Sequence, residues 1–171
     1  MSSRRIIRSF AFIDLCGFIG FMDEHGDDAA IAALTELRAI TRRAAEQYGV
    51  RIAKWLGDGA LIVGMEHEPV LDCVLEVQRE TERRLPIPGR AGVSSGPVLL
   101  LDGDDYIGWA INVAARLCAA AAPGQVLIAD GEESASAGGR LIRVRGIADP
   151  IPIHELEPAA EPVGSAGEGS R

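Results

Sequence analysis

Hydrophobic residues recur along this chain with two different periods, and each period predicts a different kind of element. Short runs rich in β-branched or aromatic residues predict strands, whereas apolar residues spaced three or four positions apart predict amphipathic helices. The predicted strands cover residues 8–13, 50–56, 60–65 and 126–129, with bent or consecutive strands over 90–101 and a terminal hairpin over 140–156 that turns near 148–150. The predicted helices cover residues 27–48, 70–85 and 108–121.

The order of these elements, β-α-β-β-α-β with strands added at the C-terminal end, predicts an α+β fold with a ferredoxin-like βαββαβ core. Asp27 and Asp28 favour the start of the first long helix, and Gly49 ends it. The chain has 171 residues, which fits one domain better than two. We expect this domain to span residues 8–156, with an extension at 1–7 and a disordered tail at 157–171, where the composition leaves little to bury.

The formal net charge of −8 argues against a nucleic-acid or anionic-membrane partner, because the surface as a whole repels phosphate groups. No stretch of the sequence approaches the roughly 18 uninterrupted apolar residues of a membrane-spanning helix, and Asp14 interrupts the N-terminal apolar run. The three cysteines are widely spaced and match neither a disulfide framework nor a metal-binding knuckle. We therefore expect a cytoplasmic protein with reduced thiols and no membrane insertion.

Two acidic residues stand at the ends of predicted strands. Asp14 follows the strand at 8–13, and Asp58 lies between two glycines at the tip of the predicted hairpin. Their carboxylates could converge across neighbouring strands and bind a hard cation through oxygen. Each also has a simpler interpretation, because an Asp after a strand is more often a turn or capping residue, and Gly-Asp-Gly is ordinary turn chemistry.

Further polar residues accompany this acidic pair. Lys54 shortly precedes Asp58, and the segment DDYIGWAINVAAR carries Asp105, Asn112 and Arg116. The i, i+4 spacing places Asn112 and Arg116 on one face of the predicted helix, where both could reach one phosphate group. The alternative is an ordinary surface helix on which Arg116 pairs with an acid and Asn112 is solvated, and the spacing alone leaves both open.

Three segments resemble, in family order, the motifs of the class III adenylate and guanylate cyclases. FAFIDLCGFIGFM resembles their first metal-binding motif, KWLGDGALIV the second, and YIGWAINVAARL their signature helix, with GVSSGP between the last two. The similarity extends over residues 8–156. The resemblance implies the class III cyclase fold, which is related to the palm-like fold of nucleotide polymerases, and it implies nucleotidyl cyclase activity.

The resemblance also implies a role for each polar residue. In the family, two aspartates and a backbone oxygen hold two Mg²⁺ or Mn²⁺ ions, a lysine and an acid read adenine, an asparagine orients the ribose, and basic residues contact the phosphates. By position, these are Asp14, Asp58 and Leu15 for the metal ions, Lys54 and Asp105 for adenine, Asn112 and Arg116 for catalysis, and Arg145 for the terminal phosphates.

The implied reaction converts ATP to 3′,5′-cyclic AMP and pyrophosphate. The ribose 3′-oxygen attacks the α-phosphorus in line with the departing pyrophosphate, and two oxygen-bound metal ions suit this chemistry. A lysine donates to adenine N1 and an aspartate accepts from the adenine amino group, so Lys54 with Asp105 favours ATP over GTP. The family combines the metal aspartates of one subunit with the base-binding and catalytic residues of the other, which implies a head-to-tail homodimer.

Two features depart from the family pattern. The segment between Gly92 and Asp105 is shorter than in many relatives, so we expect a trimmed dimer arm and a low affinity between subunits. Arg145 stands where the family usually has a lysine, which keeps the charge and changes its shape. Two other functions stay open: a catalytically silent cyclase-like module that binds a nucleotide or a partner, and a guanylate cyclase.

Overall fold

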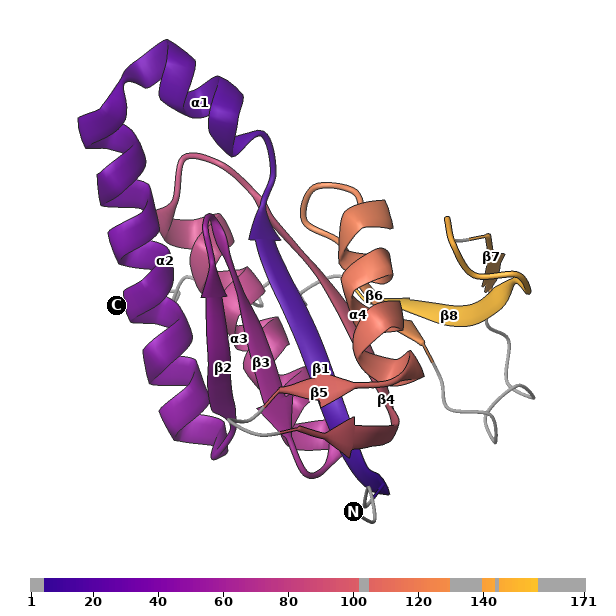
Figure 1. The fold of residues 1–171 in the computed structure, drawn as a ribbon. Coiled ribbons are helices and arrows are strands. Elements are labelled where there is room, and N and C mark those ends of the chain that lie inside the picture. Colours follow the sequence, from indigo (N-terminus) through magenta and orange to yellow (C-terminus); the bar gives the residue numbers. More distant parts are fainter. Residues whose placement is uncertain (1–4, 102–104, 130–139, 144, 157–171) are drawn as a thin grey trace, which may run out of the picture.

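A mixed β-sheet with helices on both faces confirms the predicted α+β class (Figure 1). The computed structural model describes residues 5–101, 105–129, 140–143 and 145–156. The strands are β1 (Arg5–Leu15), β2 (Arg51–Leu56), β3 (Gly59–Gly64), β4 (Gly89–Leu100), β5 (Tyr106–Ile107), β6 (Val126–Ala129), β7 (Arg140–Ile142) and β8 (Ile151–Leu156). The helices are α1 (Phe18–His25), α2 (Asp27–Tyr48), α3 (His67–Arg84) and α4 (Trp109–Ala120).

The sheet order explains the ferredoxin-like core. Along the sheet the strands run β2-β3-β1-β4-β6-β8-β7, and β5 pairs with β4 beside this path. Strands β2, β3, β1 and β4 form the core with α2 and α3. Strand β1 lies between β3 and β4 and is antiparallel to both. Strand β6 then pairs parallel to β4, as expected when a helix, here α4, connects two parallel strands. Strands β8 and β7 extend this end of the sheet as the predicted C-terminal additions.

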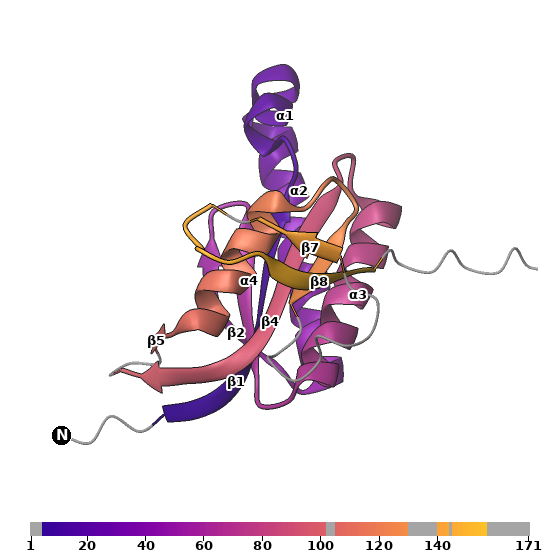
Figure 2. The ribbon, with the colours of Figure 1, turned by 90° about the vertical axis from the view of Figure 1, so that its right-hand side faces the viewer.

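The two faces of the sheet are covered by different helices, and Figure 2 shows α3 and α4 on opposite sides of it. Side chains alternate along a strand, so Ala11, Ile13 and Leu15 of β1 join the buried cluster that contains residues of α2 and α3. Phe10 points the other way and packs with residues of α4. Asp14 shares the face of Phe10 and Phe12, which places its carboxylate beside α4.

Helix α4 approaches β4 closely because Gly92 has no side chain. A β-carbon on Gly92 would lie 2.3 Å from both the Ala114 carbonyl oxygen and the Cys118 amide nitrogen. Ala110 and Ala114 are completely buried on the sheet-facing side of the helix. Small residues on both elements therefore fix the backbone of α4 against the sheet.

The structure corrects the sequence prediction in two places, and of the bent or consecutive strands predicted over 90–101 it has one continuous strand. Helix α1 was not predicted, because its eight residues are too few to establish a helical period, and none of them, all being described, is buried. Strand β1 begins at Arg5, so residues 5–7 belong to the sheet and not to an extension. Strand β4 runs without a break through Gly96 and Pro97. The predicted tail at 157–171 lies outside the described residues.

Two expectations from composition can be compared with the structure. Among the described helices, none combines the length and apolar character needed to cross a membrane. Cys16, Cys73 and Cys118 are all free thiols, as predicted.

Candidate active site

Asp14 and Asp58 are brought together at one end of the β1–β3 pair. Asp14 stands one residue before the end of β1, and Asp58 lies in the turn between β2 and β3. The Leu15 amide donates a hydrogen bond of 3.2 Å to the Asp58 carbonyl oxygen, which ties the hairpin tip to the end of β1. Gly57 has φ +60°, a left-handed conformation that favours glycine. A β-carbon on Gly59 would lie 2.1 Å from the Ile13 carbonyl oxygen, so Gly59 permits this close approach.

The two carboxylates form a negatively charged pair. Partial burial, followed by the negative charge of Asp14, raises the pKa of Asp58 above its ordinary value. The described residues contain no group of three or more His, Cys, Asp and Glu side chains that could hold a metal ion on their own. Two oxygen ligands nevertheless fit Mg²⁺, which proteins commonly bind through one or two carboxylates together with substrate phosphates. Asp14 and Asp58 are therefore suited to hold a divalent ion together with oxygen ligands from outside the protein.

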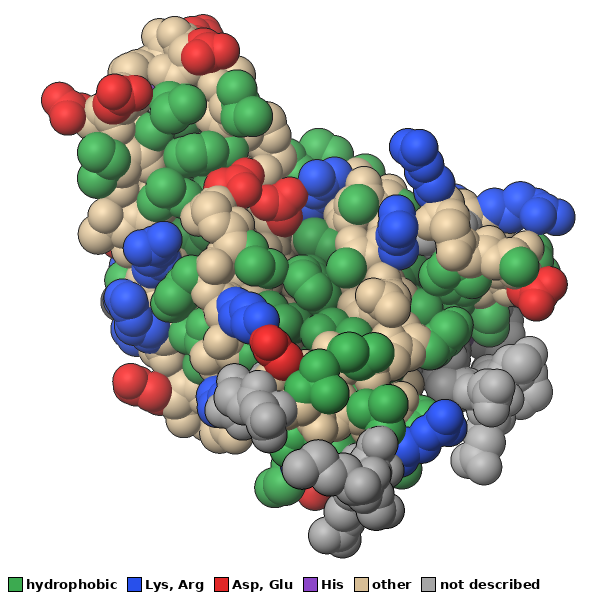
Figure 3. Space-filling model, in the orientation of Figure 1, with side chains coloured by type: hydrophobic (Ala, Val, Ile, Leu, Met, Phe, Trp, Pro, Cys, Tyr) green, Lys and Arg blue, Asp and Glu red, His purple; other side chains and the backbone are tan. Residues whose placement is uncertain are grey.

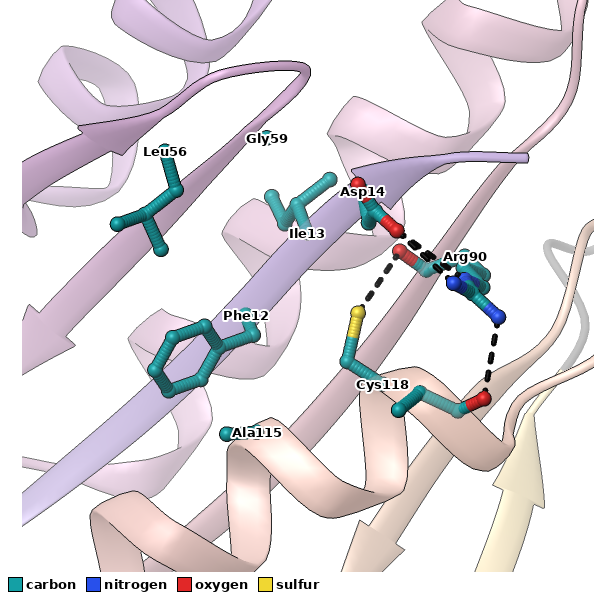
Figure 4. Close-up of a pocket in the computed structure, with 9 residues that line it drawn as sticks. Phe12, Ile13, Asp14, Leu56, Gly59, Arg90, Ala115 and Cys118 are labelled. Atoms are coloured by element: carbon teal, nitrogen blue, oxygen red, sulfur yellow. Dashed lines mark hydrogen bonds and ion pairs between the residues drawn. The ribbon is translucent and has the colours of Figure 1, made fainter. Parts of the chain in front are cut away.

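Arg90 is the cation of this carboxylate pair, and the sequence analysis missed it. Its Nη2 and Nε donate to Asp14 Oδ2 at 3.0 and 3.3 Å, and its Nη1 donates to the Ala119 carbonyl oxygen at 3.1 Å. Arg90 thus links Asp14 to the C-terminal end of α4 (Figure 4). The only advance signal would have been its place opposite Asp14 in the β1–β4 register, which cannot be read from local sequence.

A pocket of about 170 Å³ lies between the ends of these strands and α4. Phe12, Leu56 and Ala115 contribute apolar groups, while Asp14 and Arg90 contribute charge (Figure 4). Burial raises the pKa of the Cys118 thiol, which also lines the pocket, to about 12, so this thiol stays neutral. The space-filling view shows a hollow with a hydrophobic floor and charged side chains at its edges (Figure 3). A small polar group could therefore enter beside Asp14 while an apolar group packs against Phe12.

Lys54 and Asp105 form an ion pair at the other side of this face. The β2–β3 register shifts between Ile52 and Lys54, which is the signature of a β-bulge. The bulge lets Ala53 pack with the cluster beside α4 while Lys54 pairs with Asp105, although the two residues are consecutive. Both partners are about half exposed, with side-chain exposures of 52% each. Among the described residues, no ion pair joins Lys54 or Asp105 to Asp14, Asp58 or Arg90.

Asn112 and Arg116 both lie on the exposed side of α4, as their spacing predicted. The Arg116 guanidinium packs against the Gly146 backbone: a β-carbon there would lie 3.3 Å from Nη2. Arg145 precedes Gly146 in the same turn and is exposed. Arg116 of α4 and the turn that carries Arg145 therefore lie side by side. Asn112 lies one helical turn before Arg116.

Comparisons with known proteins address the family. No protein-family model matches the chain. An uncharacterized protein of Mycobacterium tuberculosis is 33% identical over 129 residues, which cover 75% of this chain and 34% of that protein. A pH-sensitive adenylate cyclase of the same species is 33% identical over 129 residues, covering 67% of this chain and 32% of the relative. The chain therefore spans about one third of the length of these relatives.

The solved structure of an adenylate/guanylate cyclase/hydrolase from Silicibacter pomeroyi is 29% identical to this chain. It superimposes with a TM-score of 0.73 and covers 92% of this chain and 99% of the solved chain. The chain belongs to the class III nucleotidyl cyclases. The fold predicted from the resemblance is thereby confirmed.

Within this cyclase domain, the structure brings some of the predicted residues together and leaves others apart. Asp14 meets Asp58, Lys54 meets Asp105, and Arg116 lies beside the turn that contains Arg145. Leu15 is buried at the end of β1, where its amide contacts the hairpin tip. The roles that the resemblance assigned to these residues stay predictions, and they are taken up below.

Proposed function

We propose that this chain is the catalytic domain of an adenylate cyclase that converts ATP to 3′,5′-cyclic AMP and pyrophosphate. The observation that carries the proposal is the pairing of Lys54 with Asp105 on the same face that holds Asp14 and Asp58. The reaction needs a hydrogen-bond donor and acceptor that bind the base, and it needs carboxylates that bind a cation. We assign the catalytic domain to residues 8–156, together with the start of β1, and we place its activity in the cytoplasm, where ATP is available.

Asp14 and Asp58 would hold two Mg²⁺ or Mn²⁺ ions, with the Leu15 backbone oxygen as a further ligand. When bound, these ions supply Lewis-acid stabilisation of the attacking and leaving oxygens. The residues themselves fit this task because two adjacent carboxylates repel each other until a cation neutralises them. Arg90 now donates to Asp14, so a cation at Asp14 would compete with this guanidinium.

Base selection follows from the direction of hydrogen bonds. The Lys54 ammonium can only donate, which matches the acceptor N1 of adenine, and the Asp105 carboxylate accepts from the adenine amino group. Guanine presents a donor at N1 and an acceptor at O6, which is the reverse order. The pair therefore supports ATP as the preferred substrate over GTP.

Asn112 and Arg116 of α4, together with Arg145 in the turn at 145–146, would act on the ribose and the phosphates. Asn112 would orient the ribose so that its 3′-oxygen attacks the α-phosphorus, while the bond from that phosphorus to the bridging oxygen breaks and pyrophosphate leaves. The 3′-hydroxyl gives up its proton to solvent water in this step, and the electron pair of the broken bond leaves with pyrophosphate. Arg116 would stabilise the negative charge on the α-phosphate, and Arg145 would bind the terminal phosphates. Catalysis would then come mainly from positioning and charge.

A head-to-tail homodimer would complete each site from two chains. Both half-sites are bordered by exposed apolar side chains that a second copy could cover. Ile19 lies on α1, close in sequence to Asp14, and Ile107 and Trp109 follow Asp105, with exposures of 72%, 53% and 46%. Large exposed apolar groups of this kind often mark an interaction surface. A monomer is expected to be inactive.

The test measures cyclic nucleotide formed from ATP and from GTP with Mn²⁺, in the wild type and in Asp14→Ala and Asp58→Ala. We expect the wild type to prefer ATP and each variant to lose about 10²–10³-fold in kcat, the scale on which removal of a charge-stabilising group acts. Equal product from all three proteins would exclude the two-metal site. A wild type that binds nucleotide and forms no product would support the silent module. The double variant Lys54→Glu/Asp105→Gly tests base selection. If the wild type prefers GTP and this double variant does not prefer GTP more strongly, the base-reading role of the pair is excluded.

A further inference from the structure

Trp55 lies on the opposite side of β2 from Lys54, its neighbour in sequence. After the bulge at Ile52 to Lys54, the strand resumes its alternation, so Lys54 faces Asp105 and Trp55 faces α2. The next residues are Leu56, which lines the pocket, and the turn that carries Asp58. Trp55 therefore sits at the centre of the segment that carries both the base-reading lysine and a predicted metal ligand.

Two arginines of α2 hold the Trp55 ring. The guanidinium carbon of Arg38 lies 5.3 Å from the ring centroid, and that of Arg42 lies 5.2 Å from it. Their i, i+4 spacing places both on the side of α2 that faces β2. Within the part of the chain that the structure describes, Arg38 Nε is buried without a hydrogen-bond partner. The guanidinium of Arg38 therefore has the Trp55 ring as a cation–π partner.

This attachment matters because β2 is an edge strand of the sheet, paired with β3 alone among the described strands, and the bulge interrupts that pairing just before Lys54. Arg51 also donates to Tyr106, and Ile52 and Ala53 pack against the core clusters. The ion pair between Lys54 and Asp105 is half exposed, and exposed ion pairs contribute little to holding a backbone in place. The contact between Trp55 and α2 therefore joins this end of β2 to the helix layer.

We propose that Trp55, held by Arg38 and Arg42, is a positioning residue that sets the place of Lys54 and so determines base selection. This inference rests on the proposed function of Lys54 as the reader of adenine. Loosening the ring would let the ammonium move relative to the hairpin tip at Asp58. A donor that is out of place discriminates less between adenine and guanine, whereas the phosphate-binding residues on α4 are untouched.

The experiment compares substitutions that remove the contact with matched ones that keep it. Trp55→Leu removes the aromatic face, and Trp55→Phe retains one. Arg42→Gln removes one cation at an exposed position, whereas Arg43→Gln changes the next residue, which pairs with Glu36 at 3.9 Å instead of contacting the ring. For each protein, kcat and KM are measured with ATP and with GTP. Dissociation constants for both nucleotides, measured in the presence of Ca²⁺, report binding separately from product formation. Thermal unfolding reports whether each variant is folded.

We expect Trp55→Leu to lower the ratio of ATP to GTP in kcat/KM by about tenfold, through a higher KM for ATP, and Arg42→Gln to lower it by about threefold, sizes that match the loss of one well-placed interaction. Trp55→Phe and Arg43→Gln should stay within about twofold of the wild type. An equal fall in kcat for both nucleotides, with the ratio unchanged, would mean a purely structural role and would overturn the inference. If the wild type forms no product yet Trp55→Leu still reduces the preference in nucleotide binding, the proposed activity fails and the positioning role stands.

Discussion

The two faces of the sheet are built in different ways, and the difference separates stability from the candidate chemistry. On the face covered by α2 and α3, large apolar side chains such as Leu37, Ile40 and Val74 are completely or almost completely buried. On the other face α4 packs on β4, β1 and β6, and residues without bulk, such as Gly92 and Ala114, let it approach β4 closely. The predicted site residues Asp14, Asn112 and Arg116 all belong to this second face.

This difference between the two faces explains why the site can be exposed without weakening the fold. Bulky residues on the α2–α3 face bury apolar surface, which is the main favourable contribution to folding. On the α4 face, large side chains such as Phe10 and Leu117 are also buried, and small residues are needed only where the helix meets β4, so polar groups can remain at the edges of the helix. Arg90, which reaches from Asp14 to the Ala119 carbonyl oxygen, fastens the end of α4 to the site.

The sharpest test of this separation is Arg116→Ala. Because Arg116 is exposed, the free energy of unfolding should change by less than about 0.5 kcal/mol, while cyclase activity should fall by about 10²–10³-fold through the loss of transition-state charge stabilisation. Cyclase assays and denaturant unfolding measure the two quantities.

The control for Arg116→Ala is Arg83→Ala on α3, an exposed arginine of the opposite face that pairs with Glu80. It should leave activity unchanged. Mixing Arg116→Ala with Asp14→Ala should restore part of the activity, because a mixed dimer would contain one intact composite site. If each variant still associates and mixing restores nothing, the shared-site dimer is wrong.

Gly92→Ala tests the close approach of α4. The added β-carbon would meet backbone atoms of Ala114 and Cys118, which cannot rotate away, so we expect a loss of about 2–3 kcal/mol in the free energy of unfolding. Gly96→Ala is the matched control, because its β-carbon would lie 3.3 Å from the Ala110 side chain, and it should cost less than about 1 kcal/mol. Urea unfolding monitored by circular dichroism compares them, and equal stability of the two variants would contradict the packing argument.

Asp58→Asn should change stability less than Gly92→Ala does, and the sign of its effect is opposite. A carboxyl whose pKa is raised by folding destabilises the folded state wherever it is ionised, so removing the charge should stabilise the protein by up to about 1 kcal/mol at neutral pH. The gain should be absent below the ordinary Asp pKa of 3.8 and should grow as pH rises through the raised value. Thermal unfolding across pH measures it, and Asp72→Asn, an acid on α3, serves as the control. A gain that is independent of pH would contradict the charge argument.

The sequence by itself determined the elements whose periodicity is strong. The apolar spacing of 27–48 corresponds to α2 at the same residues, and the helix predicted at 108–121 corresponds to α4 within one residue at each end. It also determined the spacing of Asn112 and Arg116, since helical geometry fixes where residues four apart point. Local patterns are sufficient in these cases because each element carries the information about its own buried face.

Only the tertiary structure decided what depends on contacts between distant segments. Arg90 reaches Asp14 because β1 and β4 pair in one register, although the two residues are 76 positions apart. The bulge that turns Ala53 and Lys54 to the same side of β2 likewise arises from pairing with β3. Strand pairing can shift by one residue without any change in local composition, yet such a shift moves every side chain to the other face. The partners of the site residues were therefore settled by the packing of the whole sheet.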